Sequence, residues 1–121
     1  SSSPLPFQSL LDGLVRAVPG ARSALLMDAA GELVLGAGAG DDRDALLAAY
    51  QGIALARVRR FADRFGWGTL RYVVSRHQAG HVVLRPLRDG YYLVLTLGPD
   101  ADVGRSVHVS ALTQERMDQE L

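Results

Sequence analysis

The chain has 121 residues, 48% of them hydrophobic, and its 13 basic and 13 acidic residues give a formal net charge of zero. This length predicts one domain with a core of its own, and the balanced charge argues against a nucleic-acid binder, which would show a basic excess. Because there is no cysteine and every basic residue is arginine, disulfides, thiolate metal sites, cysteine nucleophiles and a P-loop lysine are excluded.

The N-terminal residues do not resemble a targeting signal. They lack the charged and apolar regions of a signal peptide, and no apolar run approaches the roughly 18 residues of a membrane span. We therefore expect a cytoplasmic protein with no membrane span, in which residues 1–6 are a disordered N-terminal segment and residues 7–121 form one domain. Apolar residues at helical spacing predict a helix from Phe7 to Val18, ended by Pro19-Gly20.

Two short apolar runs follow this helix. Ser23–Met27 and Leu33–Leu35 are separated by Asp28–Gly31, a turn whose glycine suits a positive φ. Together they predict a β-hairpin.

The next segment, Gly36–Gly40, alternates glycine and alanine. A glycine-rich loop before a helix can bind phosphate through backbone N–H groups, but a Walker loop needs Gly-Lys-Ser/Thr at the helix start. Here Asp41 and Asp42 stand at that position and would repel phosphate. We interpret the segment as a loose connector with an acidic helix cap.

Residues 43–65 predict one long helix, ended by Gly66, with two different apolar sides. The large side chains fall on one broad side: Leu46, Leu47, Tyr50, Ile53, Ala54, Val58, Phe61 and Phe65. A second side carries only small residues: Ala45, Ala49, Gly52 and Ala56. A surface helix needs one apolar stripe, so we interpret the small side as the place where the same helix of a second copy approaches. The alternative is that alanine simply fills a well-formed helix, although mid-helix glycine costs about 1 kcal/mol relative to alanine.

Three further apolar segments predict strands: Gly68–Arg76, His81–Leu87 and Tyr91–Leu97. The second and third are joined through Asp89-Gly90, a strong hairpin signal. The third strand is almost continuously apolar, which is typical of a strand at the centre of a sheet.

The last segment, Val103–Leu121, predicts a helix, although Ser106–Ser110 also alternates as a strand would. The order α-β-β-α-β-β-β-α predicts an α/β (α+β) sandwich with a five-stranded antiparallel sheet. The long helix must cover one face, because a sheet this apolar cannot leave both faces wet.

The polar residues offer no catalytic set. His77 and His81 flank a turn, but no carboxylate or cysteine completes a metal site. Ser75, His77 and Asp89 could be read as a nucleophile set, but no motif frames the serine. We therefore expect no catalytic residue, no metal and no cofactor, and we interpret Trp67 as a core residue.

Arginines cluster late in the long helix: Arg57, Arg59, Arg60 and Arg64. One interpretation is a solvated flank with local ion pairs to Asp63. The other is a docking surface for an acidic partner or for a second subunit, because arginine is favoured at interfaces. The sequence leaves both open.

Long stretches of the chain resemble the Roadblock/dynein light-chain (Roadblock/LC7) domain. Pro19–Val34 looks like the opening of that domain, with a Pro-Gly step after the first helix and a hydrophobic strand ending in Asp-x-x-Gly. Gly80–Leu95 is similar to its two central strands, and Asp100–Gly104 to its usual start of the last helix. The resemblance covers about residues 7–121.

This resemblance implies a profilin-like roadblock fold and a homodimer. In the family the long second helices pack together and edge strands pair across subunits, which makes Thr69–Arg76 the pairing edge. The predicted dimer interface is then Ala45, Ala49, Gly52, Ala56, Arg71 and Val73.

The resemblance also implies a non-catalytic regulator or scaffold that binds a small Ras-like GTPase and modulates its GTP/GDP cycle. Family members also serve as adaptors on motors and signalling complexes, and bacterial relatives include a gliding and polarity regulator that stimulates GTP hydrolysis in its partner. Arg57, Arg60 and Arg64 are the candidate partner contacts. The alternative is a small-ligand sensor, or a dimerisation and adaptor module without a GTPase partner. An enzyme ranks last, because no activated nucleophile is visible.

Overall fold

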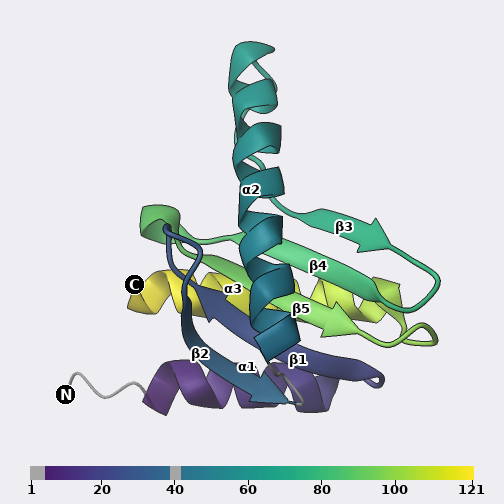
Figure 1. Cartoon of the computed structure of the whole chain (residues 1–121). Helices are drawn as coiled ribbons and strands as arrows, with labels where there is room; N and C mark the ends of the chain where they lie inside the picture. Colours follow the sequence, from purple (N-terminus) through teal and green to yellow (C-terminus); the bar gives the residue numbers. More distant parts are fainter. Residues whose placement is uncertain (1–4, 39–41) are drawn as a thin grey trace.

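The structure is a computed structural model that describes residues 5–38 and 42–121. Its elements follow the predicted order, with a 3₁₀ turn between the last two strands (Figure 1). They are α1 (Leu5–Ala17), β1 (Ala21–Met27), β2 (Leu33–Gly38), α2 (Asp42–Arg64), β3 (Val73–Arg76), β4 (His81–Pro86), η1 (Arg88–Gly90), β5 (Tyr92–Leu97) and α3 (Val103–Glu120). Within the described ranges, no helix combines the length and the apolar character needed to cross a membrane.

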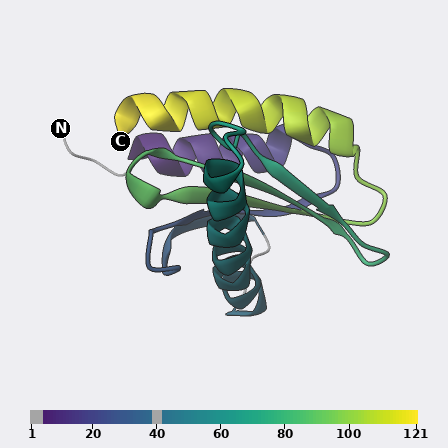
Figure 2. The same ribbon diagram turned by 90° about the horizontal axis from the view of Figure 1, so that it is seen from above.

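The strands form one sheet in the order β2-β1-β5-β4-β3, and every neighbouring pair is antiparallel. β5 lies at the centre, as its apolar sequence predicts. α1 and α3 cover one face of this sheet and α2 crosses the other (Figures 1 and 2). The predicted sandwich with a five-stranded antiparallel sheet is therefore confirmed.

The two faces of the sheet have separate cores. Strand alternation sends Leu93 and Leu95 of β5 towards α1 and α3, and Val94 towards α2. The first core is the larger, since both α1 and α3 contribute to it. On the other face, α2 buries only Ala48 and Leu55 within the core cluster. The α2 layer is therefore thin.

Both predicted hairpin turns have the expected geometry. After β1, the Asp28 carboxylate accepts hydrogen bonds of 2.9 Å from the N–H groups of Ala30 and Glu32, and Gly31 has a φ of 81°. Between β4 and β5, Asp89 (φ 60°) and Gly90 (φ 82°) both adopt the left-handed conformation, which explains the Asp-Gly pair.

Two boundaries near the N-terminus differ from the prediction. Leu5 and Pro6 belong to α1 rather than to the segment before the domain, because a proline in the first turn loses no helical hydrogen bond. Gly36, Ala37 and Gly38 extend β2 instead of forming a connector. Ala37 pairs with β1 and is buried, so the small residues allow close packing there. Residues 1–4 and 39–41, with the predicted cap at Asp41, lie outside the described residues; the cap at Asp42 stays a prediction.

The predicted strand over residues 68–76 is shorter in the structure, because β3 contains only Val73–Arg76. The backbone before it is held by α3 rather than by the sheet: Gln114 Nε2 donates to the Arg71 carbonyl at 3.5 Å. Arg71 therefore lies outside the edge strand to which the family pattern assigned it, whereas Val73 lies in that strand.

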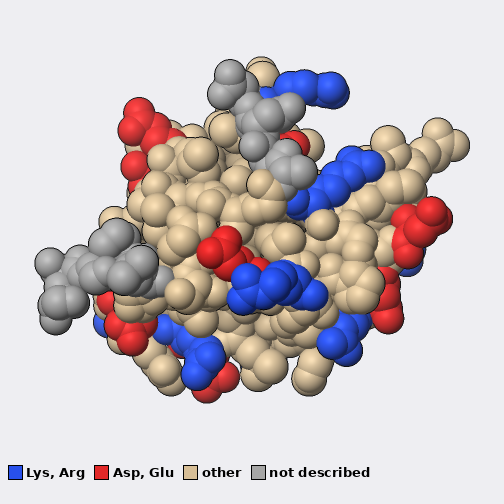
Figure 3. Space-filling view, turned by 90° about the horizontal axis from the view of Figure 1, so that it is seen from below, with Lys and Arg blue, Asp and Glu red and all other residues tan. Residues whose placement is uncertain are grey.

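The start of α3 is resolved in favour of a helix. The Asp102 carboxylate caps it by accepting a hydrogen bond from the Arg105 N–H at 3.0 Å. Ser106 and Ser110 are buried, and their hydroxyls donate to backbone carbonyls one turn earlier. The apparent strand alternation in this segment therefore comes from small polar residues on the buried side of a helix. Elsewhere, on the side seen in Figure 3, acidic and basic side chains are interspersed.

Candidate interaction surfaces

The side of α2 that faces the sheet is marked by Ala48, Leu55 and Ala62, which are all buried and stand seven residues apart. Ala49 and Gly52 lie beside them and are half-buried. Ala49 and Gly52 of the small-residue side therefore lie against the chain's own sheet. The assignment of Ala45, Ala49, Gly52 and Ala56 to an interface with a second copy stays a prediction.

Gly52 shows why small residues are needed there. A Cβ at this position would overlap the Tyr92 hydroxyl and lie 2.9 Å from Tyr92 Cζ. The same hydroxyl donates a hydrogen bond of 3.2 Å to the Ala48 carbonyl, so the ring of a β5 residue lies directly under the α2 backbone. Of the four predicted interface residues on α2, Ala45 and Ala49 are also half-buried in the single chain, and only Ala56 is exposed.

The opposite side of α2 carries large side chains that stay exposed among the described residues. We call it the α2 apolar face. It consists of Leu46 (59% exposed), Leu47 (37%), Tyr50 (64%), Ile53 (56%), Phe61 (42%), Phe65 (60%) and, just beyond the helix, Trp67 (74%). Phe61 contacts Phe65 and Trp67, with ring centroids 5.1 and 4.8 Å away. The prediction that Trp67 is a core residue is wrong. A contiguous apolar surface of this kind marks an interaction site.

α2 is longer than the sheet is wide. Its 23 residues span about 34 Å at 1.5 Å per residue, whereas five strands about 4.8 Å apart place the outer two only about 19 Å from each other. α2 crosses the strands, and its C-terminal end projects past β3 (Figure 1). Among the described strands, β3 lies at the edge and pairs with β4 alone. The projecting end of α2 has no sheet of its own to cover.

The three predicted partner contacts, Arg57, Arg60 and Arg64, are all exposed. Within residues 42–64 of α2, no ion pair joins them to Asp63, so local ion pairing does not account for the cluster. Arg60 borders a groove of about 360 Å³ between α2 and the β1–β2 turn. These side chains therefore remain available at the surface that α2 presents.

The candidate chemical residues do not form a site. The Ser75 hydroxyl and His77 Nε2 share a hydrogen bond, but Asp89 lies at the opposite end of β4 from them. His81 is buried, and its Nε2 is 3.1 Å from the Pro99 carbonyl. Among the described residues, no group of three or more potential ligands is placed to hold a metal ion.

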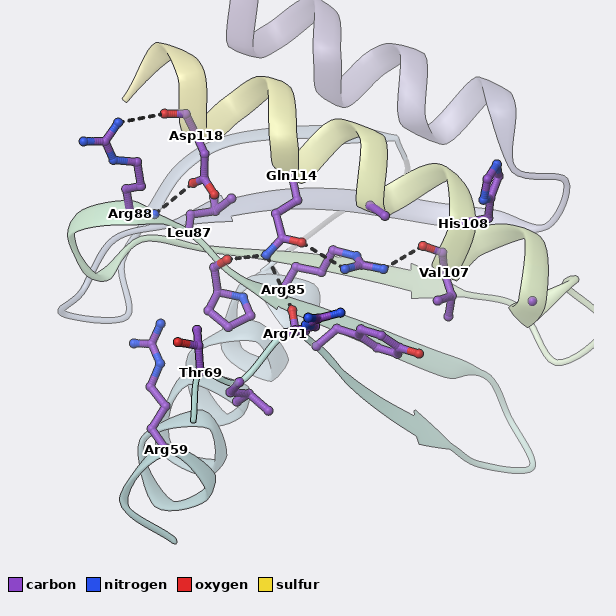
Figure 4. A pocket seen from close by; sticks show the side chains of 15 residues that line it. Arg59, Thr69, Arg71, Arg85, Leu87, Arg88, Val107, His108, Gln114 and Asp118 are labelled. Atoms are coloured by element: carbon purple, nitrogen blue, oxygen red, sulfur yellow. Dashed lines mark hydrogen bonds between the residues drawn. The ribbon is translucent and has the colours of Figure 1, made fainter. Parts of the chain in front are cut away.

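A second surface, which we call the arginine pocket, lies between α3 and the edge formed by residues 69–72 and β4 (Figure 4). Its volume is about 750 Å³. Arg85 of β4 lies at its base, only 4% exposed. Its guanidinium donates to Ser110 Oγ (2.8 Å), Gln114 Oε1 (2.9 Å) and the Val107 carbonyl (2.7 Å).

Arg85 was missed at the sequence level. The available signal was a charged residue directly after the apolar run Val82-Val83-Leu84, since arginine is almost never fully buried unless it is paired. Its guanidinium also lies 4.6 Å from the centre of the Tyr72 ring. Burial lowers the pKa of Arg85 from its ordinary value, against a smaller opposing influence of Tyr72.

Comparisons with known proteins agree with this architecture. The sequence profile of the Roadblock/LC7 domain matches residues 7–97. A Roadblock/LC7 domain from Streptomyces avermitilis is similar in structure, with a TM-score of 0.83 and 24% identity over 93% of this chain and 95% of that chain. The gliding protein MglB from Thermus thermophilus is also similar in structure, with a TM-score of 0.85 and 19% identity over 98% of this chain and 91% of that chain. MglC from Myxococcus xanthus has a TM-score of 0.66 and 25% identity over 95% of this chain and 98% of that chain. A search of curated protein sequences finds no match.

Replacing Gly52 by alanine tests the seating of α2. Helix propensity alone favours alanine by about 1 kcal/mol, but the added Cβ would meet the Tyr92 ring, so we expect a net loss of about 1–3 kcal/mol in the free energy of unfolding. Urea denaturation measures it. Gly13→Ala in α1 is the matched control: its Cβ would meet nothing within 4 Å, and it should stabilise by about 0.5–1 kcal/mol. Stabilisation by both variants would contradict the described contact.

The Tyr92 hydroxyl gives a second test, at alkaline pH. Burial first, and then the charge of Asp28, raises the pKa of Tyr92. Above about pH 10 the unfolded chain releases this proton while the folded chain keeps it, so the stability that it contributes falls as pH rises. Tyr92→Phe should cost about 1 kcal/mol near neutrality, and this difference should shrink in alkaline urea titrations. Tyr50→Phe, at an exposed hydroxyl, should leave stability near wild type throughout.

Proposed function

We propose, from the premise that this chain belongs to the Roadblock/LC7 domain family, that it acts as a homodimer that binds a small Ras-like GTPase and modulates its GTP/GDP cycle. Family membership supports a regulatory or adaptor role. The observation that carries the proposal is the α2 apolar face, seven large exposed side chains on one side of α2 and just beyond its end. A surface of this kind is completed by association.

The geometry indicates how a second copy would cover this face. β3 has an unpaired edge, and adding the β3 of a second chain there would continue the sheet beneath the projecting end of α2. The projecting end of α2 would then lie over the sheet of the partner, while Phe61, Phe65 and Trp67 would face the α2 helix of the partner. In this arrangement the two α2 helices approach through their large side chains, with Ala56 and Val73 still at the interface, while Gly52 stays against its own sheet.

Two α2 helices side by side would form a platform for the GTPase. Arg57, Arg60 and Arg64 are exposed on this helix, and arginine is favoured at interfaces for its planar, multidentate side chain. A Ras-like GTPase changes state through its switch loops, so a platform that binds one conformation better than the other shifts the equilibrium between them. The regulator needs no nucleophile of its own for this mechanism.

Ile53→Glu tests the dimer. Placing a charge in the middle of the α2 apolar face should convert a dimer into a monomer at tens of micromolar protein, because the buried charge would cost several kcal/mol. Multi-angle light scattering gives the molar mass directly. Leu112→Glu is the matched control, since Leu112 is similarly exposed (53%) but lies on α3, on the opposite side of the sheet. If the wild-type chain is monomeric under these conditions, the proposed platform of two α2 helices is wrong.

The GTPase partnership is tested with the Ras-like GTPases of the same organism. The chain should bind at least one of them and change its rate of GTP hydrolysis or nucleotide release. Arg60→Ala and Arg64→Ala should each weaken binding about tenfold or more, as truncation of interface arginines often does. Arg16→Ala on α1 should have no effect. Binding to none of these GTPases would leave an adaptor without a GTPase partner, and GTP turnover by the chain alone would contradict a non-catalytic role.

A further inference from the structure

We propose that the arginine pocket binds an acidic peptide segment of a protein partner. The pocket lies between α3 and the edge of the sheet, and Arg59 of α2 also borders it (Figure 4). It shares no residue with the α2 apolar face and is a second interaction surface, although Arg71, which lines it, is also a predicted dimer-interface residue.

The first argument is the uncompensated charge of Arg85. All three of its hydrogen-bond acceptors are neutral: a hydroxyl, an amide oxygen and a backbone carbonyl. Within residues 5–38 and 42–121, no carboxylate forms an ion pair with it. A buried charge without a counter-charge costs several kcal/mol, and an anion bound in the pocket would offset part of that cost.

The second argument is the charge of the pocket as a whole. Arg59, Arg71 and Arg88 line it together with Arg85, against the single carboxylate of Asp118, so four positive charges and one negative leave a net charge of +3. This excess stands out in a chain whose formal net charge is zero. Asp118 is already subtracted in this sum, and its carboxylate accepts a hydrogen bond of 2.9 Å from the Arg88 backbone N–H.

The third argument is the shape and the lining of the pocket, which suit an extended chain. At about 750 Å³ it runs between two elements and is open to solvent. Leu70, Val107 and Ala111 also line the pocket, so apolar side chains that alternate with carboxylates would also find contacts. Planar guanidinium groups bind carboxylates through paired hydrogen bonds.

A phosphate or nucleotide fits the pocket less well. Phosphate sites use free backbone N–H groups at a helix N-terminus, and the N-terminus of α3 does reach the pocket at Gly104. However, that terminus is already capped by the Asp102 carboxylate, which would repel a phosphate. The donors that remain are arginine side chains, which bind carboxylate and phosphate alike. They come from α2, residues 69–72, β4 and η1, and this spread matches carboxylates distributed along a peptide better than one compact phosphate group.

Fluorescence polarisation of a labelled peptide of alternating glutamate and leucine tests the proposal. The wild-type chain should bind it, should bind more weakly as salt is raised, and should not bind the matched peptide of glutamine and leucine. Arg71→Gln and Arg88→Gln should each weaken binding about tenfold, because each removes a charge-assisted hydrogen-bond donor. Arg116→Gln is the control, since this exposed arginine stands on the same helix as Gln114 but outside the pocket.

Three results would overturn the proposal: equal binding of the neutral peptide, wild-type affinity in both pocket variants, or an equal loss in Arg116→Gln. Displacement of the peptide by inorganic phosphate or GTP at lower concentration than by unlabelled peptide would also overturn it, in favour of a small anion. Ile53→Glu separates this proposal from the preceding one, because a monomer should still bind the peptide. Light scattering on both pocket variants would show that their assembly is unchanged.

Discussion

The close approach of the α2 backbone to the Tyr92 ring decides which side of α2 faces the sheet and which side is exposed. At Gly52 there is no room for a Cβ above the tyrosine, and the hydroxyl of that ring is bonded to the Ala48 carbonyl. A helix held this close to a sheet needs small residues at the point of closest approach, which are Ala48 and Gly52. Its large apolar residues are then forced outward, and the α2 apolar face follows from the same contact that seats the helix.

The two faces of the sheet consequently have different roles. α1 and α3 together cover one face with a large core. On the other face, α2 contributes few buried side chains, extends beyond the last strand and leaves β3 with a free edge (Figure 1). An unpaired edge, a projecting helix and an exposed apolar surface occur side by side. In the proposed dimer, a second copy would pair with the edge, extend the sheet under the projecting helix and cover the apolar surface.

Charged side chains are also incompletely paired in one part of the molecule, the arginine pocket. The chain is neutral overall, and both signs are interspersed over the face in Figure 3. At the arginine pocket, however, the basic residues outnumber the acidic ones. Arg85 sits in a strand position that an apolar residue could fill, and it is held there by neutral acceptors from α3. Its position links the charge of the pocket to the packing of α3 on the sheet.

Much of the fold was determined by local sequence. Helical spacing, the Asp-Gly turn and the continuous apolar run of β5 predicted the element order, the antiparallel sheet and its central strand, because these features depend on neighbours in the chain. The resemblance to the Roadblock/LC7 family rested on the same local patterns. Only the tertiary structure decided which side of α2 faces inward, because that depends on Tyr92, 40 residues away from Gly52. It also decided that residues 68–72 leave the sheet and that Arg85 lies beneath α3, since contacts between distant segments of the chain, rather than residue periodicity, set both.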